Sequence, residues 1–164
     1  MNPIDVINSK KQHLARYANE NGSNGELVTI ELNENWIPRP KGNELKLLLL
    51  ALKEVGIIIK RSSFDALSIP KGISIDFNDL VSIKASLSNI TFIEIKSANQ
   101  DRVKKDFSGF FFALTENEIK AAEALGDRHQ VALYNKKTSE VLMTSVVEII
   151  NRAKSSTWQV SVQL

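Results

Sequence analysis

The chain has 164 residues, of which 43% are hydrophobic and 24% charged, so it is long enough for one buried core and too short for two ordinary domains. Its 21 lysines and arginines against 19 acidic residues give a net charge of only +2, so the total charge does not indicate a nucleic-acid binder. The absence of cysteine excludes disulfides, thiol catalysis and thiolate zinc sites. We expect a single domain over residues 1–164.

No targeting or membrane pattern is visible. The N-terminus lacks the basic-then-apolar order of a signal peptide, and the longest apolar run, around Leu45 to Leu52, is too short to span a bilayer. We therefore expect a cytoplasmic protein with no membrane partner.

The N-terminal part is expected to hold a helix and a strand. Asn2 is placed to cap a helix that runs to about Asn19, with Pro3 at the first helical position. Residues 26–32, ELVTIEL, alternate between polar and apolar and predict a short strand. We treat residues 1–40 as an N-terminal helix and strand extension of the domain.

A leucine-rich helix is predicted from about Asn43 to Val55, with Gly56 at its C-terminal cap position. Leucines occupy most of its circumference, so we expect it to be covered on several sides. The apolar period then changes to two. Residues 57–62 and 63–69 predict strands, either as one bent strand or as a hairpin.

The second half of the chain alternates strands with capped helices. Thr115 and Glu118 form a capping box for a helix over 116–125, and Ser145 and Glu148 form one for a helix to about Ala153. Residues 76–89 are ambiguous, with a helical spacing of apolar residues. Strands are predicted at 90–98, 129–135, 140–144 and 157–164. This order favours an α/β fold, or α+β as the alternative, with a mixed sheet.

Three charged residues interrupt otherwise apolar strands. Asp65 lies in SFDALSI, whereas Glu94 and Lys96 lie two apart in ITFIEIKSA and so project from one face. Buried charges are tolerated when they are paired or bound to a metal. If the two strands are neighbours, the carboxylates converge, and oxygen ligands without a histidine cluster favour Mg²⁺. Lys96 would then stabilise charge or help to activate a water, which suits phosphodiester hydrolysis.

These residues resemble the motif of the PD-(D/E)XK nuclease superfamily, also called restriction endonuclease-like. The match lies in FDALSI and FIEIKSA, the preceding KGNELKLLLLALKEVGIIIKRSS is similar to the superfamily's first helix and strand, and FFFALTENEIKAAEALGDRHQVALYN is similar to nuclease-like domains of bacterial defence proteins. The resemblance covers roughly residues 41–135. It implies a restriction endonuclease-like core, with a central mixed β-sheet flanked by helices. It implies catalytic roles for Asp65, Glu94 and Lys96, and Mg²⁺ ligation by Asp65, Glu94, Ile95 and Glu44.

The identity of the first metal ligand stays open between two aspartates. No proline precedes Asp65, and Asp76 lies nearer in sequence to Glu94. Asp65 is preferred because its flanking residues are strand-like, whereas the residues around Asp76 are typical of a helix start.

Two basic segments adjoin these motifs, and phosphates of a DNA backbone are the groups that such segments neutralise. A solvated loop is the alternative, supported in the second segment by its acidic residues. The expected DNA-binding residues are Lys60, Arg61, Arg102, Lys104 and Lys105.

The expected function is that of a Mg²⁺-dependent endodeoxyribonuclease, most simply a type II restriction endonuclease or a related defence nuclease. Double-stranded DNA would be the substrate, and a homodimer is expected because cutting both strands usually requires two active sites. The alternatives are a Holliday-junction resolvase and a non-catalytic DNA- or protein-binding module on a nuclease fold.

Overall fold

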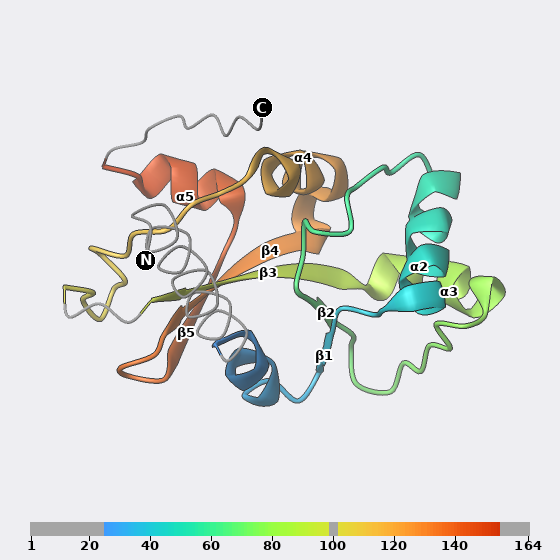
Figure 1. Cartoon of the computed structure of the whole chain (residues 1–164), viewed down its shortest axis with the longest axis horizontal. Coiled ribbons are helices and arrows are strands. Elements are labelled where there is room, and N and C mark those ends of the chain that lie inside the picture. Colours follow the sequence, from blue (N-terminus) through green and yellow to red (C-terminus); the bar gives the residue numbers. More distant parts are fainter. Residues whose placement is uncertain (1–24, 99–101, 155–164) are drawn as a thin grey trace, which may run out of the picture.

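The computed structural model describes residues 25–98 and 102–154, which form one five-stranded mixed sheet with helices on its faces (Figure 1). The sheet order is β1-β2-β3-β4-β5; β3 and β4 are parallel, and all other neighbours are antiparallel. The strands are β1 (Trp36–Pro38), β2 (Ala66–Ser68), β3 (Thr91–Ala98), β4 (His129–Asn135) and β5 (Glu140–Thr144). The expected mixed α/β content is confirmed. The helix expected before Asn19 and the strand expected at 157–164 lie outside the described residues.

Most of the helices were expected from the sequence. They are α2 (Gly42–Glu54), α3 (Leu80–Ser86), α4 (Glu116–Leu125) and α5 (Val146–Arg152), with short 3₁₀ turns at Leu87–Asn89 and Gly126–Arg128. Both capping boxes are present, at Thr115 with Glu118 and at Ser145 with Glu148. The ambiguous stretch 76–89 is therefore helical in its second part. Helix α4 lies on the connection between the parallel strands β3 and β4 (Figure 1).

The strand predicted at 26–32 is wrong, because residues 25–31 are helical. The buried positions of this segment, Gly25 and Thr29, lie four apart, which is the spacing of a helix face. The Thr29 hydroxyl also donates to the Gly25 carbonyl at 2.6 Å, as occurs within a helical turn. Seven residues are too few for polar and apolar alternation to separate the two periods.

The strands predicted at 57–62 and 63–69 are wrong except at β2. Residues 57–62 form no strand, and Ser63 closes a turn by donating from both its backbone N–H and its hydroxyl to the Lys60 carbonyl. Ile58 is 74% exposed, so this apolar run is not a core strand. The chain is thereby bent just before Asp65.

The leucine-rich helix α2 is covered over a broad face, as expected, because Leu45, Leu47 and Leu49 also pack against the core. Its buried residues are Leu48, Ala51 and Leu52, whereas Leu50 is 41% exposed. Together with α3 and α4, this side of α2 packs against the sheet face that carries Phe92. The rings of Phe64 and Phe92 meet edge to face there, with centroids 5.0 Å apart.

The other sheet face is covered differently. Ile93 and Ile95 of β3 pack with Ala66, Ala132 and with Ile30 of the helical segment 25–31. Since side chains alternate along a strand, Phe92, Glu94 and Lys96 project from the face that α4 covers. The charged pair of β3 therefore lies inside the helix-covered layer.

Truncation of one ring of the central aromatic pair should destabilise the domain. Phe92→Ala is expected to lower the free energy of unfolding by about 3–5 kcal/mol, because it empties a fully buried site and removes the edge contact with Phe64. Urea denaturation followed by circular dichroism measures this change. Phe111→Ala is the matched control: that side chain is 72% exposed, so its truncation should change stability by less than about 0.5 kcal/mol. An equal loss in both variants would contradict the assigned core.

Candidate active site

The register of β2 and β3 brings Asp65 beside Glu94. Ala66 pairs with Ile93, and Asp65 directly precedes β2, so it stands next to Glu94 on the neighbouring strand. Its backbone N–H donates to the Ile93 carbonyl at 2.8 Å, and its Oδ2 accepts from the Ile95 N–H at 2.9 Å. Asp65 thus continues the strand pairing with its side chain. In a strand the N–H and C=O of one residue face the same side, so the Ile95 carbonyl is directed toward Asp65 as well.

Two side chains from distant elements hold the segment that carries Asp65. Arg39 donates from Nη1 to the carbonyls of Arg61 and Phe64, at 3.0 and 2.8 Å. The buried ring of His129 lies with Nε2 3.2 Å from the Ser63 carbonyl, and because a carbonyl only accepts, Nε2 carries the proton. Burial lowers the pKa of His129, which keeps it neutral in this role. Asp65 is therefore presented by a fixed turn.

Lys96 is the centre of a buried ion-pair cluster. Its Nζ lies 2.9 Å from Oε1 of Glu94 and 3.0 Å from Oε1 of Glu118 on α4. The side chains of both glutamates are 6% exposed, and that of Lys96 is 15% exposed. Glu118 had been assigned only a capping role, so its contact with Lys96 was missed. Nothing in the sequence relates position 118 to position 96, because α4 must first dock on the sheet.

Glu94 has an oxygen that its surroundings leave unsatisfied. Its Oε2 is buried with no hydrogen-bond partner. Burial, and next the charge of Asp65, raise the pKa of Glu94 to about 9, against the opposing effect of Lys96. Burial also raises the pKa of Asp65, although the Ile95 N–H opposes this. Without a second cation, Glu94 therefore keeps a proton at neutral pH.

Lys96 itself stays charged. Burial acts to lower its pKa, but the ion pairs and hydrogen bonds with Glu94 and Glu118 outweigh burial, so the pKa of Lys96 is raised. Its ammonium is a permanent positive charge beside the carboxyl groups of Glu94 and Glu118.

A helix glutamate that the sequence did not single out also belongs to this neighbourhood. Glu26 is half-buried in the helical segment 25–31, and burial followed by the charge of Asp65 raises its pKa. At Gly25 of this segment, a Cβ would overlap the Ser97 hydroxyl on β3. Close approach of the helix to β3 therefore requires glycine at this position. Glu26 was missed because residues 26–32 were interpreted as a strand.

Glu44 and Asp76 make different contacts. Glu44 Oε1 accepts from the Asn78 side chain at 3.1 Å, and Asp76 Oδ1 accepts from the Asn78 backbone N–H at 2.9 Å. Both contacts are exposed and lie between α2 and the start of α3. Of the two aspartates left open by the sequence, Asp65 is the one that stands beside Glu94.

The two basic segments lie at different positions along the sheet. Lys60 and Arg61 are exposed in the turn that presents Asp65. The second segment follows the carboxyl end of β3, after the undescribed residues 99–101, and its side chains at Arg102, Lys104 and Lys105 are exposed. Only the first segment adjoins Asp65 directly in the chain.

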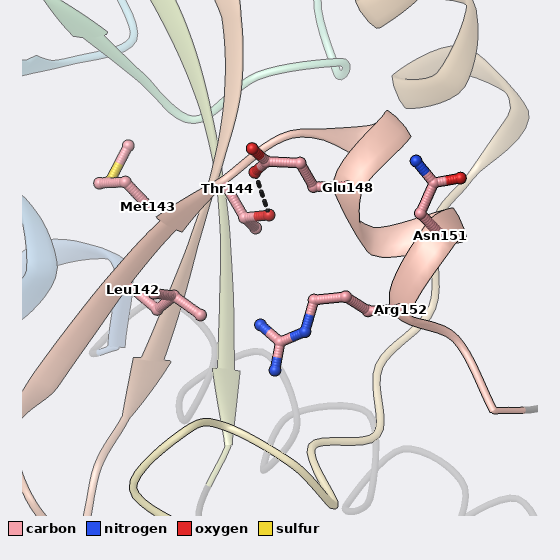
Figure 2. A pocket seen from close by; sticks show the side chains of 6 residues that line it. All are labelled: Leu142, Met143, Thr144, Glu148, Asn151 and Arg152. Carbon is pink, nitrogen blue, oxygen red and sulfur yellow. Dashed lines mark hydrogen bonds between the residues drawn. The ribbon is translucent and has the colours of Figure 1, made fainter.

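A separate pocket lies between β5 and α5 (Figure 2). Its Glu148 accepts from the Thr144 hydroxyl at 2.8 Å, and Arg152 donates to the Asp106 carbonyl at 2.7 Å. Thr144 pairs with Val131, which pairs with Glu94, so this pocket begins two strands away from the ion-pair cluster. Three of its polar side chains, Thr144, Glu148 and Arg152, already have partners within the chain.

The carboxylates of Asp65 and Glu94 suit a hard divalent cation. Among residues 25–98 and 102–154, no group of three or more histidine or acidic side chains could hold a metal ion. Mg²⁺, however, keeps several waters and binds through one or two carboxylates together with substrate phosphates. The buried, unpartnered Oε2 of Glu94 is an oxygen that a proton or a cation would satisfy. The donor set therefore fits Mg²⁺ in its substrate-assisted mode.

Comparisons with protein-family models, with curated proteins and with solved structures found no match for this chain. Within the part of the chain that the structure describes, no helix is long and apolar enough to cross a membrane. The geometry around Lys96 is therefore the basis for assigning a function.

The raised pKa of Glu94 predicts that stability falls as pH rises. The folded protein holds the Glu94 proton up to about pH 9, whereas the unfolded chain releases it near 4.5, so the free energy of unfolding should decrease through this window. The slope attributable to Glu94 is at most about 1.4 kcal/mol per pH unit. Urea denaturation of the metal-free protein at pH 5, 7 and 8.5 measures it. Glu94→Gln should flatten the slope, and an unchanged slope in this variant would show that Glu94 is ionised when folded.

Proposed function

We propose that the protein is a Mg²⁺-dependent endodeoxyribonuclease, of the restriction or related defence type, with a restriction endonuclease-like core. The observation that carries this proposal is the convergence of Asp65, Glu94 and Lys96, with one buried oxygen of Glu94 unpartnered. A neutral aliphatic side chain in place of any one of them would make a simpler core, so retaining all three in a buried layer favours a chemical role.

Each residue has a distinct task in hydrolysis. Asp65 and Glu94 supply the oxygens that hold the cation, and Asp65 is oriented by the Ile95 N–H. Bound Mg²⁺ supplies a Lewis acid for the phosphate and lowers the pKa of a coordinated water. Lys96, 2.9 Å from Glu94, provides a permanent positive charge for the additional negative charge that develops on the phosphate oxygens as water attacks phosphorus, before the P–O bond breaks and its electrons leave with the departing oxygen.

Glu26 is the helix glutamate that we propose to add negative charge near Asp65, without itself holding the cation, in place of Glu44, which the sequence resemblance suggested. The support for Glu26 is the effect of the Asp65 charge on its pKa and its half-buried position beside β3. Glu44 instead contacts Asn78.

Double-stranded DNA is the proposed substrate, and the proposed form is a cytoplasmic homodimer that brings two sites to opposite strands. The exposed turn with Lys60 and Arg61 precedes Asp65, so it is suited to neutralise phosphates next to the scissile bond. The segment with Arg102, Lys104 and Lys105 would contact the backbone farther along the duplex.

A second candidate is a non-catalytic DNA- or protein-binding module on the same fold. The observation in its favour is that Lys96 is already paired with both Glu94 and Glu118, so the cluster is satisfied electrostatically except at one oxygen. A purely structural ion cluster would need no metal.

Cleavage of DNA by the purified protein is the decisive measurement. With Mg²⁺, supercoiled plasmid should be converted to nicked and linear forms, and EDTA should abolish this conversion. Glu94→Gln and Lys96→Met should each lower the rate at least about 100-fold, because each removes a charge that acts on the reacting phosphate. Lys46→Ala, a substitution of an exposed lysine on α2, should leave the rate unchanged and controls for general loss of positive charge.

The substrate panel separates the candidate functions. Linear duplex, single strands and four-way junctions should be tested together, and preference for the four-way junction would reassign the protein as a junction resolvase. Binding without cleavage across the whole panel would establish the non-catalytic module. Full activity in both Glu94→Gln and Lys96→Met would refute the proposed site.

The two helix glutamates provide a matched pair of variants. Glu26→Gln should raise the Mg²⁺ concentration needed for half-maximal cleavage by about 10-fold, because it removes one negative charge near Asp65. Glu44→Gln should leave it unchanged, since Glu44 is engaged with Asn78. Titration of the cleavage rate with Mg²⁺ measures both. The opposite order of effects would restore Glu44 as the acidic residue of the site.

A further inference from the structure

We propose that Glu118 is a positioning residue for Lys96, a role that rests on the proposed nuclease function and extends the site to α4. Among the buried residues of the helices that the structure describes, Glu118 is the one with a charged side chain, and its two oxygens have separate partners. Oε1 accepts from Lys96 Nζ at 3.0 Å, and Oε2 accepts from the Thr115 backbone N–H at 2.8 Å. The carboxylate thus links the reactive lysine to the first turn of α4.

This link matters because Lys96 is shared with Glu94. In the structure its ammonium lies between the carboxyl groups of Glu94 and Glu118 at almost equal distances. When Glu94 binds a cation, its attraction for Lys96 weakens and like charges repel. Glu118 then keeps the ammonium in place, because the Thr115 N–H and the helix backbone fix its own position. A long, flexible lysine would otherwise be free to swing away from the phosphate.

Helix capping alone does not account for this arrangement. Ser145 and Glu148 form the same capping box at α5, with the Glu148 carboxylate accepting from the Ser145 N–H. Glu148 is exposed, and its additional partner is the Thr144 hydroxyl (Figure 2). Glu118, by contrast, is 5% exposed and faces an ammonium. Burial of Glu118 is a cost that the cap by itself does not require.

Glu148, which has the same capping role, is therefore a matched control for Glu118. Glu118→Gln retains the capping box, which accepts glutamine at this position, but removes the charge that holds Lys96. We expect kcat for DNA cleavage to fall about 10- to 100-fold while KM changes less than about 2-fold, because the reacting group is misplaced and the DNA surface is intact. Glu148→Gln should change neither constant. Glu118→Asp, which keeps the charge but shortens the side chain, should lower kcat similarly and serves if the glutamine variant does not fold.

A spectroscopic readout separates this proposal from the nuclease assignment. In protein labelled with ¹⁵N-lysine, the Lys96 ammonium should give a slowly exchanging NMR signal, assigned by its loss in Lys96→Met. The signal should persist when Mg²⁺ is added, and it should broaden or vanish in Glu118→Gln but not in Glu148→Gln.

The possible outcomes separate the nuclease function from the positioning role of Glu118. A wild-type protein that does not cleave DNA, but whose Lys96 signal depends on Glu118, refutes the nuclease function and leaves the positioning role standing. A Glu118→Gln variant that retains both the wild-type kcat and the Lys96 signal refutes the positioning role. An equal fall of kcat in Glu118→Gln and Glu148→Gln would also refute it, because capping would then explain both.

Discussion

The buried ammonium of Lys96 is the interaction on which the arrangement of the site depends. An unpaired charge at this depth would cost several kcal/mol, so carboxylates must reach it from whichever elements surround β3. One comes from the same strand face, at Glu94, and the other from α4, at Glu118. Burial of Lys96 therefore requires that α4 is docked, and docking of α4 with Glu118 facing the sheet requires Lys96. The capping box is what brings Glu118 to the correct turn of the helix.

The site forms where regular pairing between two strands stops. β2 is only three residues long, and β3 continues for five residues beyond Ile93, which is its last residue paired with β2. At this boundary the Asp65 side chain takes the hydrogen bond of the Ile95 N–H that a longer β2 would have taken with backbone. Because β2 is short, a carboxylate occupies the position at which a longer strand would place a backbone carbonyl. Arg39 and His129 keep the preceding turn from relaxing.

Local patterns in the sequence predicted the parts of this site that depend on one element. Alternation over 90–98 predicted β3 and placed Glu94 with Lys96, and the spacing of Thr115 and Glu118 predicted the start of α4. Contacts between elements that are distant in the sequence could not be predicted from these local patterns. Glu26 was missed because a seven-residue segment fits two periodicities, and Glu118 because its capping role already explained the residue type. A strand was expected at 57–62 because isoleucines favour strands. That expectation was wrong because the turn closed by Ser63 overrides the preference.

Arg39 and His129 hold the turn before Asp65, so the site can form only when distant parts of the chain have come together. Its groups come from positions 26 to 129 of the chain, and they meet only after β1, β3, β4 and α4 have all assembled. No short fragment of the chain contains the site, and the loops between its parts must close before Lys96 meets Glu118 and before Asp65 meets the Ile95 N–H. The complete charge cluster therefore requires the whole sheet and α4, and a chain that has not completed its sheet carries no assembled site.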